Sequence, residues 1–184
     1  MLTLDTMNRI LDTVDELNSR FQIDNYPIYM KNIIETYYNN RCILGCIPMD
    51  HKIDAVTNYD PVSGYYVITV NHNKTSLNMR RRLNFTLAHE LGHIVLDHEP
   101  YYRNSSGLTL KQLQVYEKEA DEFAGQFLMP EDIVQCCPKI NVMCDRFYVS
   151  SQAAEKRLDM IKNRQYLSSG QFAKAILIKS LRMR

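Results

Sequence analysis

The segment His89-Glu90-Leu91-Gly92-His93 has the spacing H-E-x-x-H, which is suited to binding a metal ion. Residues four apart lie on the same face of a helix, so His89 and His93 can direct both imidazoles at one ion. The carboxylate of Glu90, beside the first histidine, can reach a water molecule at that ion. The pattern therefore predicts peptide-bond hydrolysis at a zinc site, with Glu90 as general acid and base.

The residues around this motif are apolar, which argues against a chance pattern on an exposed helix. Ala88, Leu91 and Ile94 surround the polar side chains and predict that the helix is buried. Burying two imidazoles and a carboxylate without a partner would cost several kcal/mol. A bound metal ion removes that cost, so the sequence favours a metal site.

A catalytic zinc site needs a third protein ligand and keeps its fourth position for water. In the longer pattern H-E-x-x-H-x-x-G-x-x-H, the glycine and the third histidine would fall on Leu96 and Glu99, so this class is excluded. His98 comes one residue too early to be that ligand. We expect His98 at the end of the helix, where a positive charge suits the helix dipole.

The better source of a third ligand is the acidic stretch at 117–124. Glu117 and Asp121 are four residues apart and share one face of a predicted helix. We assign Glu117 as the third ligand and Asp121 as the acceptor of the free N–H of a ligating imidazole. Glu119 is the main alternative to Glu117. By helical spacing, Glu119 and Glu122 lie on other faces, where we expect them to be solvated.

Hydrophobic periodicity predicts helices on both sides of a small sheet. Apolar residues at helical spacing indicate helices at 3–21, 28–39, 77–98 and 109–129. Runs of β-branched and aromatic residues predict strands at 43–47, 55–59 and 65–70. The turn residues 60–64 join the last two strands in a hairpin, so we expect a small antiparallel sheet. The fold class is therefore α+β.

The last third of the chain differs in charge from the rest, although the net charge is only +1. Residues 1–133 contain 18 acidic and 12 basic residues, whereas residues 134–184 contain 3 acidic and 10 basic residues. Short helices are predicted at 130–137 and 140–147, and Ser150 is placed to cap a third helix. We divide the chain into a metallopeptidase domain at 1–130 and a basic helical subdomain at 131–184.

Cysteine usage and hydropathy indicate where the protein acts. The five cysteines are odd in number and lack paired C-x-x-C spacing, which is typical of free thiols in a reducing compartment. No apolar run approaches the ~20 residues that cross a membrane, and the first residues do not resemble a signal peptide. We therefore expect a cytoplasmic protein without membrane contact. Its oligomeric state is not predicted.

Three blocks together resemble the ImmA/IrrE family of metallopeptidases: NFTLAHELGH at 84–93, EKEADEFAGQFLMP at 117–130 and FYVSSQAAEKRL at 147–158. The resemblance covers roughly residues 60–160. It implies a gluzincin-like fold, in which an active-site helix and a glutamate helix accompany the sheet and a small helical segment follows. By motif position it also implies that His89, His93 and Glu117 bind zinc and that Glu90 is the catalytic acid and base.

The resemblance further implies a narrow substrate. Members of this family cleave a helix-turn-helix transcriptional repressor, often encoded beside them in mobile genetic elements, and thereby relieve repression. This chain resembles the short anti-repressor type without a C-terminal sensor domain. Two histidines and a glutamate favour zinc, although Mn²⁺ or Fe²⁺ can occupy the same ligands.

A second hypothesis is a regulator without peptidase activity. Residues 139–163 resemble a helix-turn-helix and are basic, so a zinc-stabilised protein could bind a repressor or DNA through them. Here Glu90 would be dispensable, while Lys156 and Arg157 would matter. We favour the view that these helices pack on the peptidase domain, because a helix-turn-helix shape does not establish DNA binding.

Overall fold

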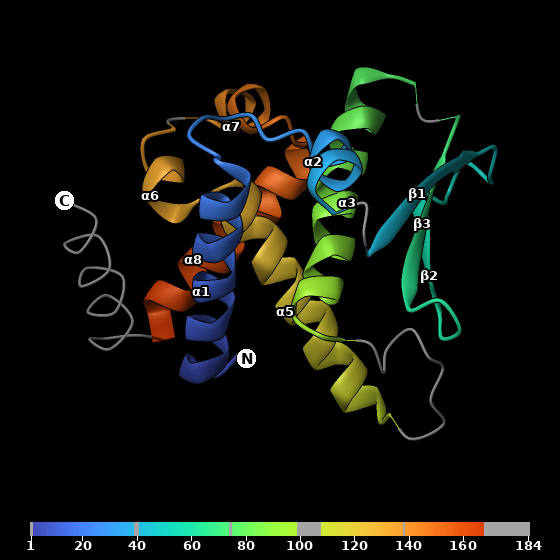
Figure 1. Ribbon diagram of the computed structural model, residues 1–184. Helices are drawn as coiled ribbons and strands as arrows, with labels where there is room; N and C mark the ends of the chain where they lie inside the picture. Colours follow the sequence, from blue (N-terminus) through green and yellow to red (C-terminus); the bar gives the residue numbers. More distant parts are fainter. Residues whose placement is uncertain (1, 39–40, 74, 99–107, 138, 168–184) are drawn as a thin grey trace.

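The computed structural model describes residues 2–38, 41–73, 75–98, 108–137 and 139–167, and Figure 1 shows its arrangement. The helices are α1 (Leu4–Phe21), α2 (Met30–Tyr37), α3 (Leu77–Val95), α5 (Leu110–Leu128), α6 (Glu131–Val134), α7 (Ile140–Phe147) and α8 (Ser151–Leu167). The strands are β1 (Cys42–Ile47), β2 (Ala55–Asp60) and β3 (Tyr65–Asn71). This confirms the predicted α+β class.

The three strands form one sheet in the order β1-β3-β2. The predicted hairpin is present, since β2 and β3 pair antiparallel around a turn in which Gly64 has a φ of 74°. The expectation of a wholly antiparallel sheet is wrong, because β1 pairs parallel to β3. Tyr66, Ile68 and Val70 of β3 are buried, so the most apolar strand takes the central position between β1 and β2.

Asn71, at the end of β3, holds the connection that makes this topology possible. Its amide group donates hydrogen bonds to the carbonyl oxygens of Met49, Asp50 and Ile53, all within 3.2 Å. Its side-chain oxygen accepts a hydrogen bond from the backbone N–H of Met49. These bonds replace water for a buried amide and fix the loop that carries the chain from β1 to the far edge of β3.

Helix α3 lies between the sheet and α5 (Figure 1). It begins immediately after Ser76, whose hydroxyl accepts a hydrogen bond from the backbone N–H of Met79. Gly92 allows α3 and α5 to approach closely, because a Cβ there would lie 2.9 Å from Phe123 and 3.2 Å from the Cα of Ala120. The glycine of the H-E-x-x-H segment therefore sets the distance between the two helices.

Helices α1 and α8 flank α5 and supply cations to its acidic residues (Figure 1). Arg157 of α8 has no exposed side-chain surface and donates a hydrogen bond to Glu122 at 3.0 Å. Its Nε donates to the carbonyl oxygen of Met129, and Arg164 donates to Glu122 at 2.8 Å. The expectation that Glu122 is solvated is wrong, because α8 packs over that face of α5.

The helices after residue 130 share the hydrophobic core of the preceding elements. Met143, Phe147, Ala154 and Ile161 are buried in the same cluster as the residues of α1, α3 and α5. The boundary between 1–130 and 131–184 stays a prediction, and residues 168–184 of the second part lie outside the described residues.

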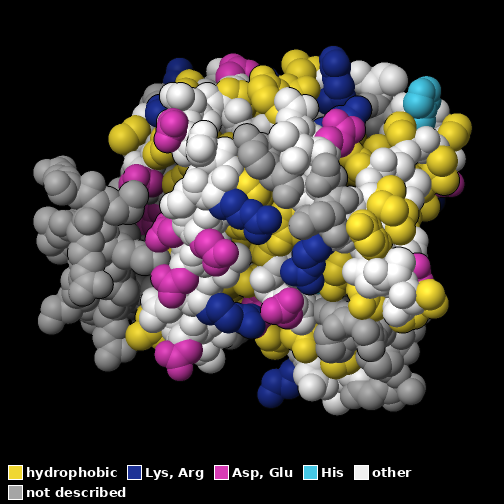
Figure 2. Space-filling model, in the orientation of Figure 1, with side chains coloured by type: hydrophobic (Ala, Val, Ile, Leu, Met, Phe, Trp, Pro, Cys, Tyr) yellow, Lys and Arg dark blue, Asp and Glu magenta, His cyan; other side chains and the backbone are white. Residues whose placement is uncertain are grey.

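Two further expectations concern the thiols and the membrane. Each of the five cysteines is a free thiol, as predicted. Among the helices of the described segments, none combines the length and apolarity needed to span a bilayer. Exposed hydrophobic side chains lie over the sheet, at the right of Figure 2. Among them, Ile43, Ile47 and Val56 of β1 and β2 are at least one third exposed.

Replacing Arg157 by Met should destabilise the fold by about 3 kcal/mol, because the Glu122 carboxylate then stays buried with only one cation beside it. The free energy of unfolding in urea measures this loss. Lys162→Met, at an exposed position of the same helix, is the matched control and should change the stability little. Equal stability losses in the two variants would contradict a buried ion pair.

Candidate metal centre

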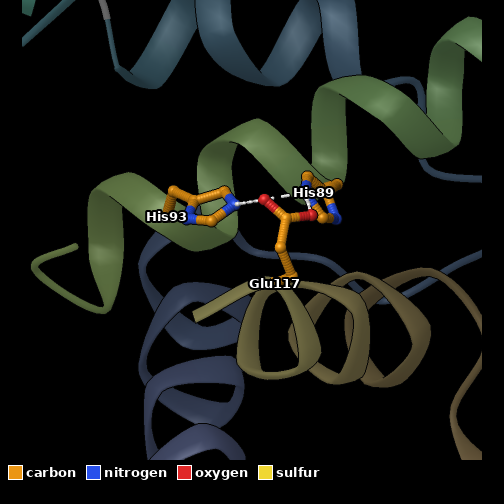
Figure 3. A group of neighbouring side chains, drawn as sticks. All are labelled: His89, His93 and Glu117. Carbon is orange, nitrogen blue, oxygen red and sulfur yellow. Dashed lines mark hydrogen bonds and ion pairs between the residues drawn. The ribbon is translucent and has the colours of Figure 1, made fainter. Parts of the chain in front are cut away.

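His89 and His93 of α3 and Glu117 of α5 point toward one another across the helix crossing (Figure 3). The two imidazole Nε2 atoms are 3.1 Å apart. The Glu117 carboxylate lies 3.5 Å from Nε2 of His89 and 3.7 Å from Nε2 of His93. A tetrahedral zinc ion with bonds of about 2.0–2.1 Å keeps its ligand atoms roughly 3.3 Å apart, so these residues fit such an ion.

The centre is buried on one side and open on the other. The side chain of His93 is 1% exposed and that of His89 is 17% exposed, whereas that of Glu117 is 42% exposed. A substrate or a water molecule can therefore approach beside Glu117, while the histidines are shielded by protein. An accessible position of this kind distinguishes catalytic zinc sites from closed structural ones.

Asp121 lies beside His89, and its role behind a metal ligand stays a prediction. Its Oδ1 is 3.1 Å from Nδ1 of His89, and its Oδ2 accepts a hydrogen bond from Lys156 at 2.7 Å. A carboxylate at Nδ1 holds the proton on that nitrogen and leaves Nε2, which faces Glu117, free to bind a metal. The spacing of four residues on α5 thus places one carboxylate at the metal position and the next behind the imidazole.

Two residues near the centre have contacts that the sequence analysis did not predict. His98 lies just after the end of α3, as expected, but it is buried with its Nδ1 3.0 Å from Nδ1 of His93. The expectation that Glu119 is solvated is wrong, since its carboxylate is buried and lies 2.8 Å from Nε2 of His98. The spacing on α5 gives the direction of Glu119 but not the elements that cover that face.

One sequence-level signal could have found these residues. A ligating imidazole normally donates its second N–H to an acceptor, and Asp121 can satisfy only one of the two histidines. Nδ1 of His93 therefore needs another hydrogen-bond acceptor, and His98 is a polar residue close to it in sequence. Glu119, the alternative ligand, lies outside the cluster of possible ligand atoms formed by His89, His93 and Glu117.

Glu90 is half-buried and follows His89 directly on α3. Its charge also acts on Cys42 at the start of β1: burial, together with the charge of Glu90, raises the pKa of that thiol to about 11. The Glu90 carboxylate is therefore near enough to β1 for its charge to act on Cys42, and it follows His89 directly in sequence. This position agrees with the role predicted for it, which stays a prediction.

The electrostatics of the two histidines differ. Burial lowers the pKa of His89, but the hydrogen bonds to Asp121 and Glu117 outweigh this effect and raise it to about 9. Burial and the neighbouring histidines lower the pKa of His93 to about 3. With these pKa values, His89 is protonated on both ring nitrogens at neutral pH without a metal, whereas His93 is neutral.

Comparison with known proteins agrees with this geometry. The family model described as Peptidase_M78, the IrrE N-terminal-like domain, matches residues 47–159, which is more than half of the chain. The chain belongs to this family. The matched residues of this IrrE-like protein include α3, α5 and all the residues of the metal centre. Helices α1 and α2 and most of β1 precede the match.

The family assignment rests on the family model, and the similarity to solved structures is weaker. No curated protein matches the IrrE-like chain. A solved structure of a Mycobacterium tuberculosis transcriptional regulator is similar, with 18% sequence identity and a TM-score of 0.46. The similarity covers 85% of this chain but only 47% of that structure's chain.

Metal binding to the IrrE-like protein should release about one proton near pH 7, because the ion replaces the proton on His89, whose pKa is about 9. The apparent zinc affinity should rise about tenfold per pH unit from pH 7 toward pH 9 and then level off. Calorimetric titration in buffers of different ionisation enthalpy measures the proton release. An affinity that does not change over this range would contradict the assignment.

Asp121→Asn provides the matched control, since it removes the carboxylate that raises the pKa of His89. In this variant His89 should lose its proton at lower pH, so the pH-dependent range of zinc affinity should move below that of the unmodified protein.

Proposed function

We propose that this IrrE-like protein is a zinc-dependent endopeptidase that cleaves a specific protein partner, a helix-turn-helix transcriptional repressor. The observation that supports the peptidase activity is the convergence of His89, His93 and Glu117 with one accessible side, next to Glu90. The repressor as substrate rests on the resemblance to the ImmA/IrrE family.

A zinc ion bound by these residues would supply a Lewis acid that polarises the scissile carbonyl and lowers the pKa of a water molecule. The protein supplies the proton transfers and the positioning. Glu90 takes the proton from the attacking water and delivers it to the leaving amine. Asp121 would keep the proton of His89 on Nδ1, so that Nε2 would be available to hold the zinc ion.

The exposed side of Glu117 is where a peptide would enter. Because His93 is almost fully buried and His89 nearly so, a substrate approaches past the carboxylate rather than past the imidazoles. The catalytic glutamate and the metal ligands come from two helices that pack closely at Gly92, so the reacting groups are held on rigid elements.

The alternative function, DNA binding through residues 139–163, has less support. Arg157 is 1% exposed and paired with Glu122, so it is not available to a phosphate group. Lys156 is paired with Asp121 at 2.7 Å. Both basic residues that this hypothesis needed are therefore paired with carboxylates of α5 in the folded protein.

Glu90→Gln should retain zinc and lose cleavage of the repressor by a factor of about 100 or more, because the amide cannot accept the proton of the attacking water. Where a neighbouring reading frame encodes a helix-turn-helix protein, that protein is the substrate to use, and mass spectrometry detects its fragments. Zinc content is measured in parallel to show that the site is intact.

Glu155→Gln, an exposed carboxylate on α8, is the matched control and should cleave normally. Undiminished cleavage by Glu90→Gln would contradict the peptidase mechanism and would favour the regulator without peptidase activity.

A further inference from the structure

We propose that His98, Glu119 and Arg9 form a positioning chain that orients the metal ligand His93, and that helix α1 thereby supports the metal centre. The inference rests on the metal site of the proposed function. Arg9 lies outside the region matched by the family model, which begins at residue 47, so that match assigns it no role. The three residues link the N-terminal helix to the reaction site through successive polar contacts.

The chain begins at the end of α3, where the backbone turns sharply. Asp97 adopts a left-handed conformation with a φ of 57°, and the N–H of His98 donates to the carbonyl oxygen of His93 at 2.9 Å. The N–H of Asp97 points to the carbonyl oxygen of Ile94 at 3.4 Å. This pair of bonds is a Schellman motif, which folds the residue after the helix back over its last turn. It brings the ring of His98 beside the ring of His93.

The side-chain contacts give the proton positions if Nε2 of His93 binds a metal. The proton of His93 is then on Nδ1 and is donated to Nδ1 of His98, 3.0 Å away. The proton of His98 must in turn be on Nε2, and it is donated to Glu119 at 2.8 Å. Every donor in this chain thus has an acceptor.

Arg9 supplies a cation beside the buried Glu119 carboxylate. The Arg9 guanidinium donates to the same oxygen of Glu119 at 2.6 Å. The carboxylate is 7% exposed, and a buried carboxylate without a cation would be costly, so Arg9 offsets its charge. Tyr116 stacks on His98 with ring centroids 4.4 Å apart and holds the middle of the chain in place.

The two metal histidines are therefore supported in parallel ways. His89 contacts Asp121 directly, and that carboxylate is paired with Lys156 of α8. His93 contacts Glu119 through His98, and that carboxylate is paired with Arg9 of α1. In each case an imidazole donates toward a carboxylate on α5 that is neutralised by a cation from a flanking helix. His98 is a positioning residue and not a fourth ligand, because both of its nitrogens are engaged away from Glu117.

His98→Phe tests this chain, because it keeps an aromatic ring against Tyr116 but removes both nitrogens. The dissociation constant for zinc, measured by chelator competition on the full chain, should rise roughly tenfold to a hundredfold. His98→Gln, whose amide can accept from His93 and donate to Glu119, should restore part of the affinity. The melting temperature of the metal-free protein is recorded for each variant to separate zinc binding from folding.

Arg9→Met is a second test in case His98→Phe fails to fold. The Arg9 side chain is 52% exposed, so replacing it should leave the protein folded. We expect its zinc dissociation constant to rise about twofold to fivefold. Arg20→Met removes the same charge from the same helix without contacting Glu119 and should leave the affinity unchanged. Unchanged zinc affinity in both His98→Phe and Arg9→Met, or an equal loss in Arg20→Met, would overturn the proposal.

These measurements use no substrate, so they are separable from the proposed function. A protein that binds zinc but cleaves no repressor would contradict the peptidase proposal alone. Unchanged zinc affinity in both His98→Phe and Arg9→Met would contradict the positioning chain alone.

Discussion

The close crossing of α3 and α5 at Gly92 is the constraint on which the metal centre depends. A Cβ at this position would meet the ring of Phe123 and the backbone of Ala120, so any larger residue would push the helices apart. Because His93 lies one residue after Gly92 and Glu117 lies three residues before Ala120, that separation would move the ligands away from each other. Packing at an apolar contact therefore sets the geometry of a polar site.

Three acidic residues of α5 are paired with basic residues from the flanking helices. Glu119, Asp121 and Glu122 point in different directions, and each meets a cation from α1 or α8. Asp121 in turn contacts His89, and Glu119 contacts His98, which contacts His93. The basic residues of α8 contribute to the fold and the site by neutralising α5, which is why their number alone is poor evidence for a nucleic-acid surface.

The parts of the site that follow from local spacing could be predicted from the sequence. His89 and His93 share a helical face, and Glu117 shares one with Asp121, whatever else packs around them. The surroundings of Glu119 and His98 could not be predicted, because they depend on which distant helix covers a face and on a left-handed turn after α3. The parallel pairing of β1 was missed for a similar reason, since it depends on contacts between strands that are not neighbours in sequence.

The most direct test of this account is X-ray absorption spectroscopy at the zinc edge of the full chain loaded with one equivalent of zinc. The account predicts a four-coordinate ion with two imidazole nitrogens and two oxygens at about 2.0–2.1 Å, one of them from Glu117. Glu117→Gln should alter this shell, whereas His98→Gln should keep its two imidazoles. A sulfur ligand at about 2.3 Å, or a third imidazole, would contradict the assignment of His89, His93 and Glu117 as the metal centre.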